Sequence, residues 1–140
     1  MKVELFALCA AATKGPVGEL NILGLTEIVI LPQFPAAINC CVVTKIRFQS
    51  TESGVKEIQT SIVNVDGKPI CPPLIQKANV QIPTGASSAI VGTIQGIHNL
   101  QIPNPGQYQI GLTVNQREEA TILFQAYQPP QFQRPPTPAE

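Results

Sequence analysis

Residues 105–127 limit most strongly what this chain can fold into. They contain two segments in which apolar and polar residues alternate, joined by a short turn. From Tyr108 to Val114 every second residue is apolar, and the alternation resumes in residues 117–127. A period of two places one set of side chains on one face of a β-strand. Asn115-Gln116 fits the two-residue turn between them, because Asn tolerates the left-handed conformation. The segment therefore predicts a β-hairpin with one buried face.

The chain before this hairpin also divides into strand-length apolar segments separated by turn residues, and it contains no long helical repeat. The expected strands are 3–10, which is apolar on both faces, and 19–31, 40–49, 55–65, 76–82 and 89–97. Residues 70–74 hold two adjacent prolines and are expected at an edge or crossing. Together these features predict an all-β fold: an immunoglobulin-like antiparallel β-sandwich of about seven or eight strands.

Four local features refine this expectation. Gly24 indicates a bulge or bend within one long strand over residues 19–31. In residues 40–49 one face is apolar and the other is expected to face solvent. Residues 55–65 are assigned to a strand, although their apolar spacing also fits a helix and that alternative stays open. Tyr108 follows Pro105-Gly106 as it would in a tyrosine corner.

The end of the chain differs in composition from the rest. Residues 128–140 contain five prolines, which cannot hold a sheet and favour an extended, flexible tail. The domain organisation predicted is a β-sandwich domain over residues 1–127 and a proline-rich tail over residues 128–140.

Charge and cysteine usage limit the partners and the compartment. Nine basic and nine acidic residues give formal neutrality, and charged residues make up only 13% of the chain. Nucleic acid and anionic membrane are therefore not expected as partners, since both normally require a basic patch. No signal peptide or membrane-spanning segment is recognisable, which favours a cytoplasmic location.

The four cysteines are interpreted as buried thiols in a reducing compartment. Cys9, Cys40, Cys41 and Cys71 lack the spacing of a zinc site, so no metal is expected. The adjacent pair would point to opposite faces of a strand, so at most one shares the core with Cys9. Whether Cys40 or Cys41 pairs with Cys9 or Cys71 stays open.

No arrangement of residues indicates catalysis. His98, the single histidine, falls in an expected loop, and Glu118 and Glu119 would alternate in direction along a strand. Asp66 belongs to the Asp66-Gly67 turn, where Asp bonds locally. No glycine-rich phosphate loop is present. We therefore expect no enzyme activity, no catalytic, cofactor-binding or metal-binding residues, and no cofactor.

A set of turn and strand motifs resembles an uncharacterised bacterial domain-of-unknown-function family. The resemblance spans residues 2–125 and rests on the opening KVELFALC strand, residues 20–24, Phe34-Pro35-Ala36, Asp66-Gly67-Lys68 and Pro105-Gly106-Gln107-Tyr108. It implies a compact β-sandwich without an established activity.

These observations favour a non-catalytic structural or protein-interaction module. Its partner would be another copy of itself or another protein, contacted through sheet edges, the apolar first strand or the proline-rich tail. The alternative is a small-ligand or glycan-binding sandwich whose site is formed by the loops at residues 83–88 and 98–104.

Overall fold

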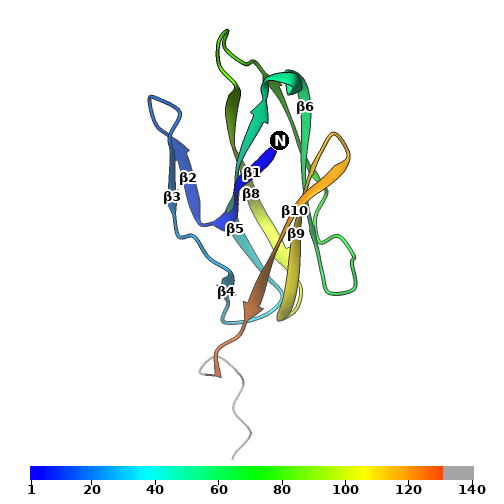
Figure 1. The fold of residues 1–140 in the computed structure, drawn as a ribbon. Coiled ribbons are helices and arrows are strands. Elements are labelled where there is room, and N and C mark those ends of the chain that lie inside the picture. Colours follow the sequence, from blue (N-terminus) through cyan, green and yellow to red (C-terminus); the bar gives the residue numbers. More distant parts are fainter. Residues whose placement is uncertain (131–140) are drawn as a thin grey trace, which may run out of the picture.

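The computed structural model describes residues 1–130, and this part of the chain is built almost entirely of β-strands (Figure 1). A three-residue 3-10 turn at Ser50–Glu52 follows directly after one of the strands. The strands are β1 (Lys2–Cys9), β2 (Ala11–Lys14), β3 (Leu20–Leu23), β4 (Ile28–Ile30), β5 (Ala36–Gln49), β6 (Gly54–Val63), β7 (Leu74–Val80), β8 (Ser88–Ile102), β9 (Gly106–Val114) and β10 (Arg117–Tyr127). The predicted all-β class is confirmed.

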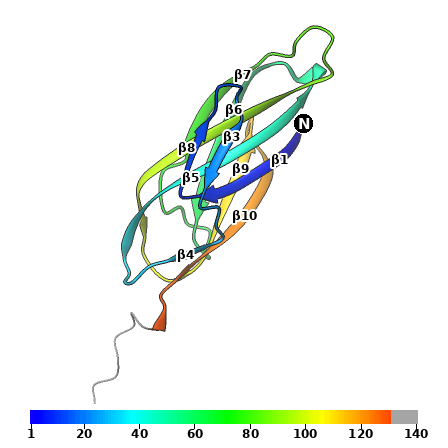
Figure 2. The same ribbon diagram turned by 90° about the vertical axis from the view of Figure 1, so that its left-hand side faces the viewer.

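The strands form two larger sheets and one small hairpin. One sheet has the order β1-β5-β8, and the other has the order β4-β10-β9-β6-β7. Pairing is antiparallel throughout except between β4 and β10, which run parallel. Strands β2 and β3 pair only with each other and form a separate hairpin that lies over β5 and β8 (Figures 1 and 2).

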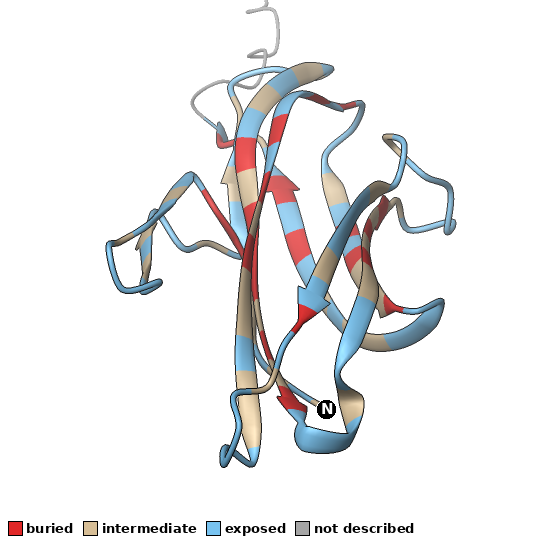
Figure 3. Cartoon of the chain, turned by 90° about the horizontal axis from the view of Figure 1, so that it is seen from above, coloured by how far each residue is buried: buried red, intermediate tan, exposed pale blue. Residues whose placement is uncertain are grey.

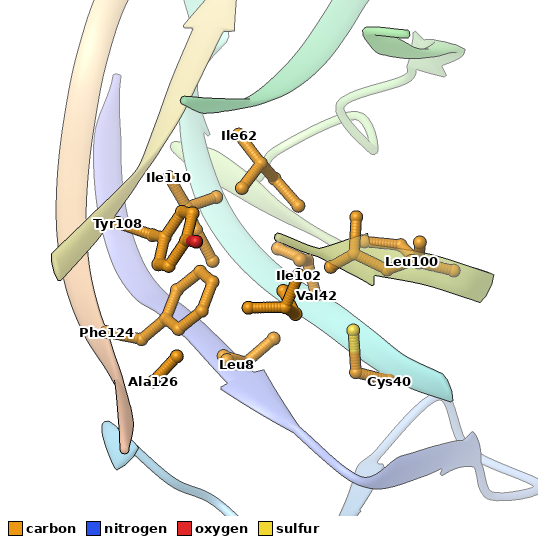
Figure 4. Close-up of a cluster of buried hydrophobic side chains, with 11 residues drawn as sticks. Leu8, Cys40, Val42, Ile62, Leu100, Ile102, Tyr108, Ile110, Phe124 and Ala126 are labelled. Atoms are coloured by element: carbon orange, nitrogen blue, oxygen red, sulfur yellow. The ribbon is translucent and has the colours of Figure 1, made fainter. Parts of the chain in front are cut away.

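The core lies between the two sheets because each contributes the apolar face of its alternating strands. Buried and exposed residues alternate along the strands in Figure 3. One cluster of buried side chains, drawn in Figure 4, contains Leu8, Cys40, Val42, Ile62, Ile97, Leu100, Ile102, Tyr108, Ile110, Phe124 and Ala126. A second cluster contains Ile46, Phe48, Ile58, Val80, Leu112 and Val114.

Four buried polar side chains lie between these two clusters: Thr44, Thr60, Thr93 and Gln95. Along β5, Thr44 falls between Val42 of the first cluster and Ile46 of the second. The Thr60 hydroxyl donates a hydrogen bond of 2.5 Å to Gln95 Oε1, and Gln95 Nε2 donates to the Leu74 carbonyl. The hydroxyls of Thr44 and Thr93 have no hydrogen-bond partner among residues 1–130. The core is therefore crossed by a polar layer that is only partly satisfied.

The predicted hairpin and tyrosine corner are both present. Asn115 and Gln116 have φ values of 49° and 68°, as the tight turn between β9 and β10 requires. The Tyr108 hydroxyl donates to the Asn104 carbonyl at 2.6 Å and accepts from the Asn104 N–H at 3.3 Å. Its ring stacks on Phe124 with centroids 5.2 Å apart. Tyr108 thus fastens the start of β9 to the preceding turn.

The prediction of one long strand over residues 19–31 is wrong. The segment contains two short strands, β3 and β4, which belong to different sheets. Gly24 separates them with φ +71°, and a Cβ there would lie 2.8 Å from the Ala10 Cβ. Because Gly24 has a left-handed backbone and packs directly against Ala10, the strand ends there and the chain changes direction. Sequence reasoning also missed β2, which it left in a loop.

The prediction that the second face of residues 40–49 is exposed is wrong in part. Val43 on that face is fully buried, and Cys41, Lys45 and Arg47 are only partly exposed. The reason is that the β2–β3 hairpin folds over the outer face of the three-stranded sheet, where Leu20 approaches Gly92. This cover comes from a distant segment and is not visible in the local alternation.

The remaining segments follow the predictions more closely. Residues 55–65 form a strand, since β6 runs from Gly54 to Val63, and the helical alternative is excluded. The double proline precedes β7, which lies at the edge of its sheet. In the predicted tail, the Gln128 side chain donates to the Pro32 carbonyl at 3.0 Å and Pro129 is buried. The rest of that tail, from residue 131, lies outside the described residues.

Replacing Tyr108 by Phe is expected to lower the free energy of unfolding by about 0.5 to 1.5 kcal/mol, because the ring still stacks on Phe124 but the hydrogen bond to the Asn104 carbonyl is lost. Urea unfolding measures the change. Tyr127→Phe, at an exposed tyrosine, is the matched control and should change stability by less than about 0.5 kcal/mol. Equal effects of the two substitutions would contradict the role given to the Tyr108 hydroxyl.

Replacing threonine by valine is expected to change the stability of the protein differently at Thr44 and Thr60, although the exposed fraction of both residues is 0%. At Thr44 it removes an unpartnered hydroxyl, so stability should stay unchanged or rise by up to about 1 kcal/mol. At Thr60 it leaves Gln95 Oε1 buried without its donor and should cost about 1 to 3 kcal/mol. Denaturant midpoints of the two variants, compared with the parent chain, test this difference in sign.

Candidate functional site

His98 does not lie in a loop as predicted, because β8 extends past it to Ile102. Its side chain is exposed and lines a shallow cleft together with Cys71. No hydrogen bond joins the two residues within the described part of the chain. Burial raises the pKa of the Cys71 thiol, which is the opposite of the activation that a nucleophilic cysteine needs. This pair therefore lacks the geometry and the ionisation of a catalytic dyad.

The four cysteines gather around β5 without forming a disulfide. Cys9 and Cys41 are opposite each other in the β1–β5 register, whereas Cys40 faces the core. Cys9 therefore does not share the core with Cys40. Burial, with a smaller contribution from Cys41, raises the pKa of Cys40 to about 11, and burial also raises that of Cys9. Both thiols stay protonated near neutral pH.

The acidic residues Asp66, Glu118 and Glu119 lie in local turn, hydrogen-bond or ion-pair arrangements. Asp66 lies in a turn whose backbone is bonded by the Asn64 side chain and closed by Gly67 at φ +79°. Glu118 accepts a hydrogen bond from Thr121, and Glu119 lies 3.8 Å from the Arg117 guanidinium. Within residues 1–130 no three His, Cys, Asp or Glu side chains are grouped closely enough to hold a metal ion. No helix in this part of the chain has the length and apolar character to cross a membrane.

The two loops proposed for a ligand site do not meet. Residues 83–88 precede β8 and residues 98–104 lie at its far end, so the strand itself separates them. At about 3.3 Å per residue, they are roughly 30 to 45 Å apart. The structure therefore gives no common site to these segments.

An open seam between the two larger sheets is the feature best suited to contact another molecule. On one side is β1, which pairs with β5 alone and leaves its other edge without a strand partner. On the other side is β10, which meets β4 only over residues 125–127. On the side that faces β1, residues 117–124 of β10 have no hydrogen-bonded strand within residues 1–130, although β1 lies beside them. Unpaired strand edges of this kind can add a further strand.

The chain's own residues 23–31 already close part of this seam. Ala10 N–H donates to the carbonyls of Leu23 and Gly24, and Thr26 N–H donates to the Leu8 carbonyl. The same segment then crosses to β10, where Gln125 N–H donates to the Glu27 carbonyl at 2.9 Å. A single extended segment thus bonds to the edges of both sheets in turn.

Above this segment the seam forms an apolar groove of about 510 Å³. Leu25 and Leu123 on its border are 63% and 51% exposed. The groove is lined by Leu5, Phe6, Ala7, Leu8, Leu25, Thr26, Glu27, Ile122 and Leu123. The sequence indicated the wall of the groove formed by β1, because this strand is apolar on both faces. The wall formed by β10 was missed, because pairing between distant segments decides which strands lie next to each other.

The unpaired backbone groups of the groove follow from strand geometry. N–H and C=O groups of alternate residues point to the same strand edge. Since the Leu8 carbonyl faces the seam, Phe6 also directs its N–H and C=O there. Since the Gln125 N–H faces the seam, so do the backbone groups of Leu123. An apolar groove with backbone donors and acceptors on both walls can bind an extended peptide.

Comparison with known proteins identifies the family. The chain belongs to DUF6941, a family of unknown function, whose model matches residues 4–126. This confirms the resemblance to an uncharacterised domain family. A search of the curated proteins finds no match to the sequence.

Among solved structures, the fold is similar to part of a β-glucosidase from Listeria innocua. Its complex with glucose gives a TM-score of 0.53 at 13% identity and covers 87% of this chain but 16% of that chain. The complex with isofagomine gives a TM-score of 0.53 at 12% identity, with the same coverage. This likeness concerns the fold alone, and the present chain spans 16% of the length of that enzyme.

Alkylation should distinguish the half-buried Cys41 from the buried Cys40. In the native protein at neutral pH, iodoacetamide is expected to label Cys41 first, because burial and the raised pKa of Cys40 keep that thiol protonated and covered. Peptide mass spectrometry over a time course measures both rates. In guanidinium chloride the two rates should converge, and a faster reaction of Cys40 in the native protein would contradict its buried position.

Proposed function

We propose that this chain is a non-catalytic protein-interaction module that accepts an extended peptide segment at the seam between β1 and β10. The observation that carries the proposal is the pair of open sheet edges with an apolar groove between them. The chain's own residues 23–31 support it, since they bond to both edges as an added strand would. A second copy of the chain and a different protein are both possible sources of that segment.

We further propose that the two larger sheets form an immunoglobulin-like sandwich. Facing sheets with a shared core and a tyrosine corner support this class. The unpaired state of the four cysteines supports a reducing, cytoplasmic setting.

A selection of short random peptides against the whole chain tests the proposed function. Bound sequences are expected to alternate apolar and polar residues, as an added strand in a one-sided groove requires. Amide exchange should show new protection at Phe6 and Leu123. Sedimentation over a series of concentrations shows whether a second copy supplies the strand. A monomer that selects no peptide would overturn the proposal.

The substitution Leu123→Lys should weaken binding of a selected peptide about tenfold or more, because it places a charge on the apolar border of the groove. Ile75→Lys is the matched control, since Ile75 is similarly exposed, at 57% against 51%, but lies on β7. Fluorescence anisotropy measures both affinities. Equal affinities of the two variants would place the peptide elsewhere.

A further inference from the structure

A second cleft lies under the β2–β3 hairpin, on the outer face of the three-stranded sheet. Its volume is about 570 Å³, within the range of about 300 to 1,000 Å³ that small-molecule sites occupy. It is lined by Leu5, Val17, Gly18, Glu19, Leu20, Ile22, Lys45, Ile90 and Gly92. Its walls include no residue of β10, and Leu5 is the one lining residue that it shares with the peptide groove at the seam.

The cleft has a floor and a roof that come from different parts of the chain. Leu5, Lys45 and Gly92 are cross-strand neighbours on β1, β5 and β8, and they form one row of the floor. Leu20 and Ile22 of the hairpin form the roof. A Cβ placed on Gly92 would meet the Leu20 methyl groups at 3.6 to 3.7 Å. These are ordinary van der Waals distances, so the Leu20 side chain lies directly over the sheet at Gly92.

The floor carries the positive charge of Lys45, which interacts with the Glu4 carboxylate only beyond ion-pair distance. Lys45 is partly buried, and none of the ion pairs among residues 1–130 includes it. The nearby acid, Glu4, is held by Arg47, whose Nε lies 2.6 Å from its carboxylate, and this hydrogen bond lowers the pKa of Glu4. At the hairpin loop, the Glu19 carboxylate accepts the Val17 N–H at 3.0 Å. An anion in the cleft would find Lys45 available.

We infer that this cleft binds a small amphipathic carboxylate, with an apolar chain between the hairpin and the sheet and a carboxylate at Lys45. The apolar walls exclude water from the apolar chain of the ligand, and the ammonium group of Lys45 favours a negatively charged head group. A site with mainly apolar walls and a few polar groups is the usual form of such a pocket. Here the charged residues are Lys45 on the floor and Glu19 at the hairpin loop. A cationic amphiphile would place its head against Lys45 and is rejected.

Titration with octanoate tests the inference, with octylammonium and octanol as probes that keep the chain length and change the head. Octanoate should bind saturably and shift the amide resonances of Leu20, Ile22 and Ile90. Octylammonium should not bind there, and octanol should bind about tenfold more weakly than octanoate. Shifts confined to Ile122 and Leu123 would place the ligand in the seam and overturn the inference without affecting the proposed peptide site.

The substitution Lys45→Met keeps an unbranched side chain and removes the charge. It should weaken octanoate binding about tenfold and leave octanol binding unchanged. Lys77→Met, at an exposed lysine on β7, is the matched control and should bind octanoate like the parent chain. Thermal unfolding shows whether each variant is folded. Ile90→Glu, in the apolar wall, is a second test and should also weaken octanoate binding about tenfold. Octanoate binding that is insensitive to both cleft variants, or equal for all three probes, would overturn the assignment.

Discussion

The burial of β5 on both faces is the constraint on which the rest of this structure depends. Its inward side chains, Val42, Ile46 and Phe48, are at most 1% exposed, and burying each contributes about 1.5 to 3 kcal/mol. They join both clusters of the core, and so they hold the two larger sheets together. Its outward face is not left to solvent, since Val43 is also fully buried beneath the hairpin. One strand thus organises the core on one side and the cover on the other.

The polar layer through the core shows that packing here is not governed by apolar burial alone. Thr60 and Gln95 join β6 to β8 across the two sheets by a buried hydrogen bond. Such a bond contributes little net stability, but a shift of register would leave its groups unpaired at a larger cost. The layer therefore favours one alignment of the sheets over its neighbours. The same alignment places β1 beside β10 and so defines the seam.

The two proposed sites lie where the fold leaves strands without partners or covers. The seam exists because β4 is short and pairs with only the last residues of β10. The cleft exists because the hairpin covers the three-stranded sheet incompletely, resting on it near Gly92. Both are surfaces shaped by backbone arrangement, and neither contains a cluster of catalytic side chains among the described residues. The proposed binding of a strand at one site and of an anion at the other would together make this chain a module that binds other molecules.

Local sequence patterns determined the parts of this protein in which neighbouring residues interact. The alternation of residues 106–127, the left-handed Asn115 and the Tyr108 corner were all predictable, because each depends on residues close together in the chain. Only the tertiary structure decided that Gly24 divides residues 19–31 between two sheets, since the obstacle is the Ala10 side chain on another segment. It also decided that Val43 is covered and that Lys45 faces a cleft. Strand pairing and hairpin placement depend on long-range contacts. The alternation of apolar and polar residues within one strand does not predict which distant segment will cover it.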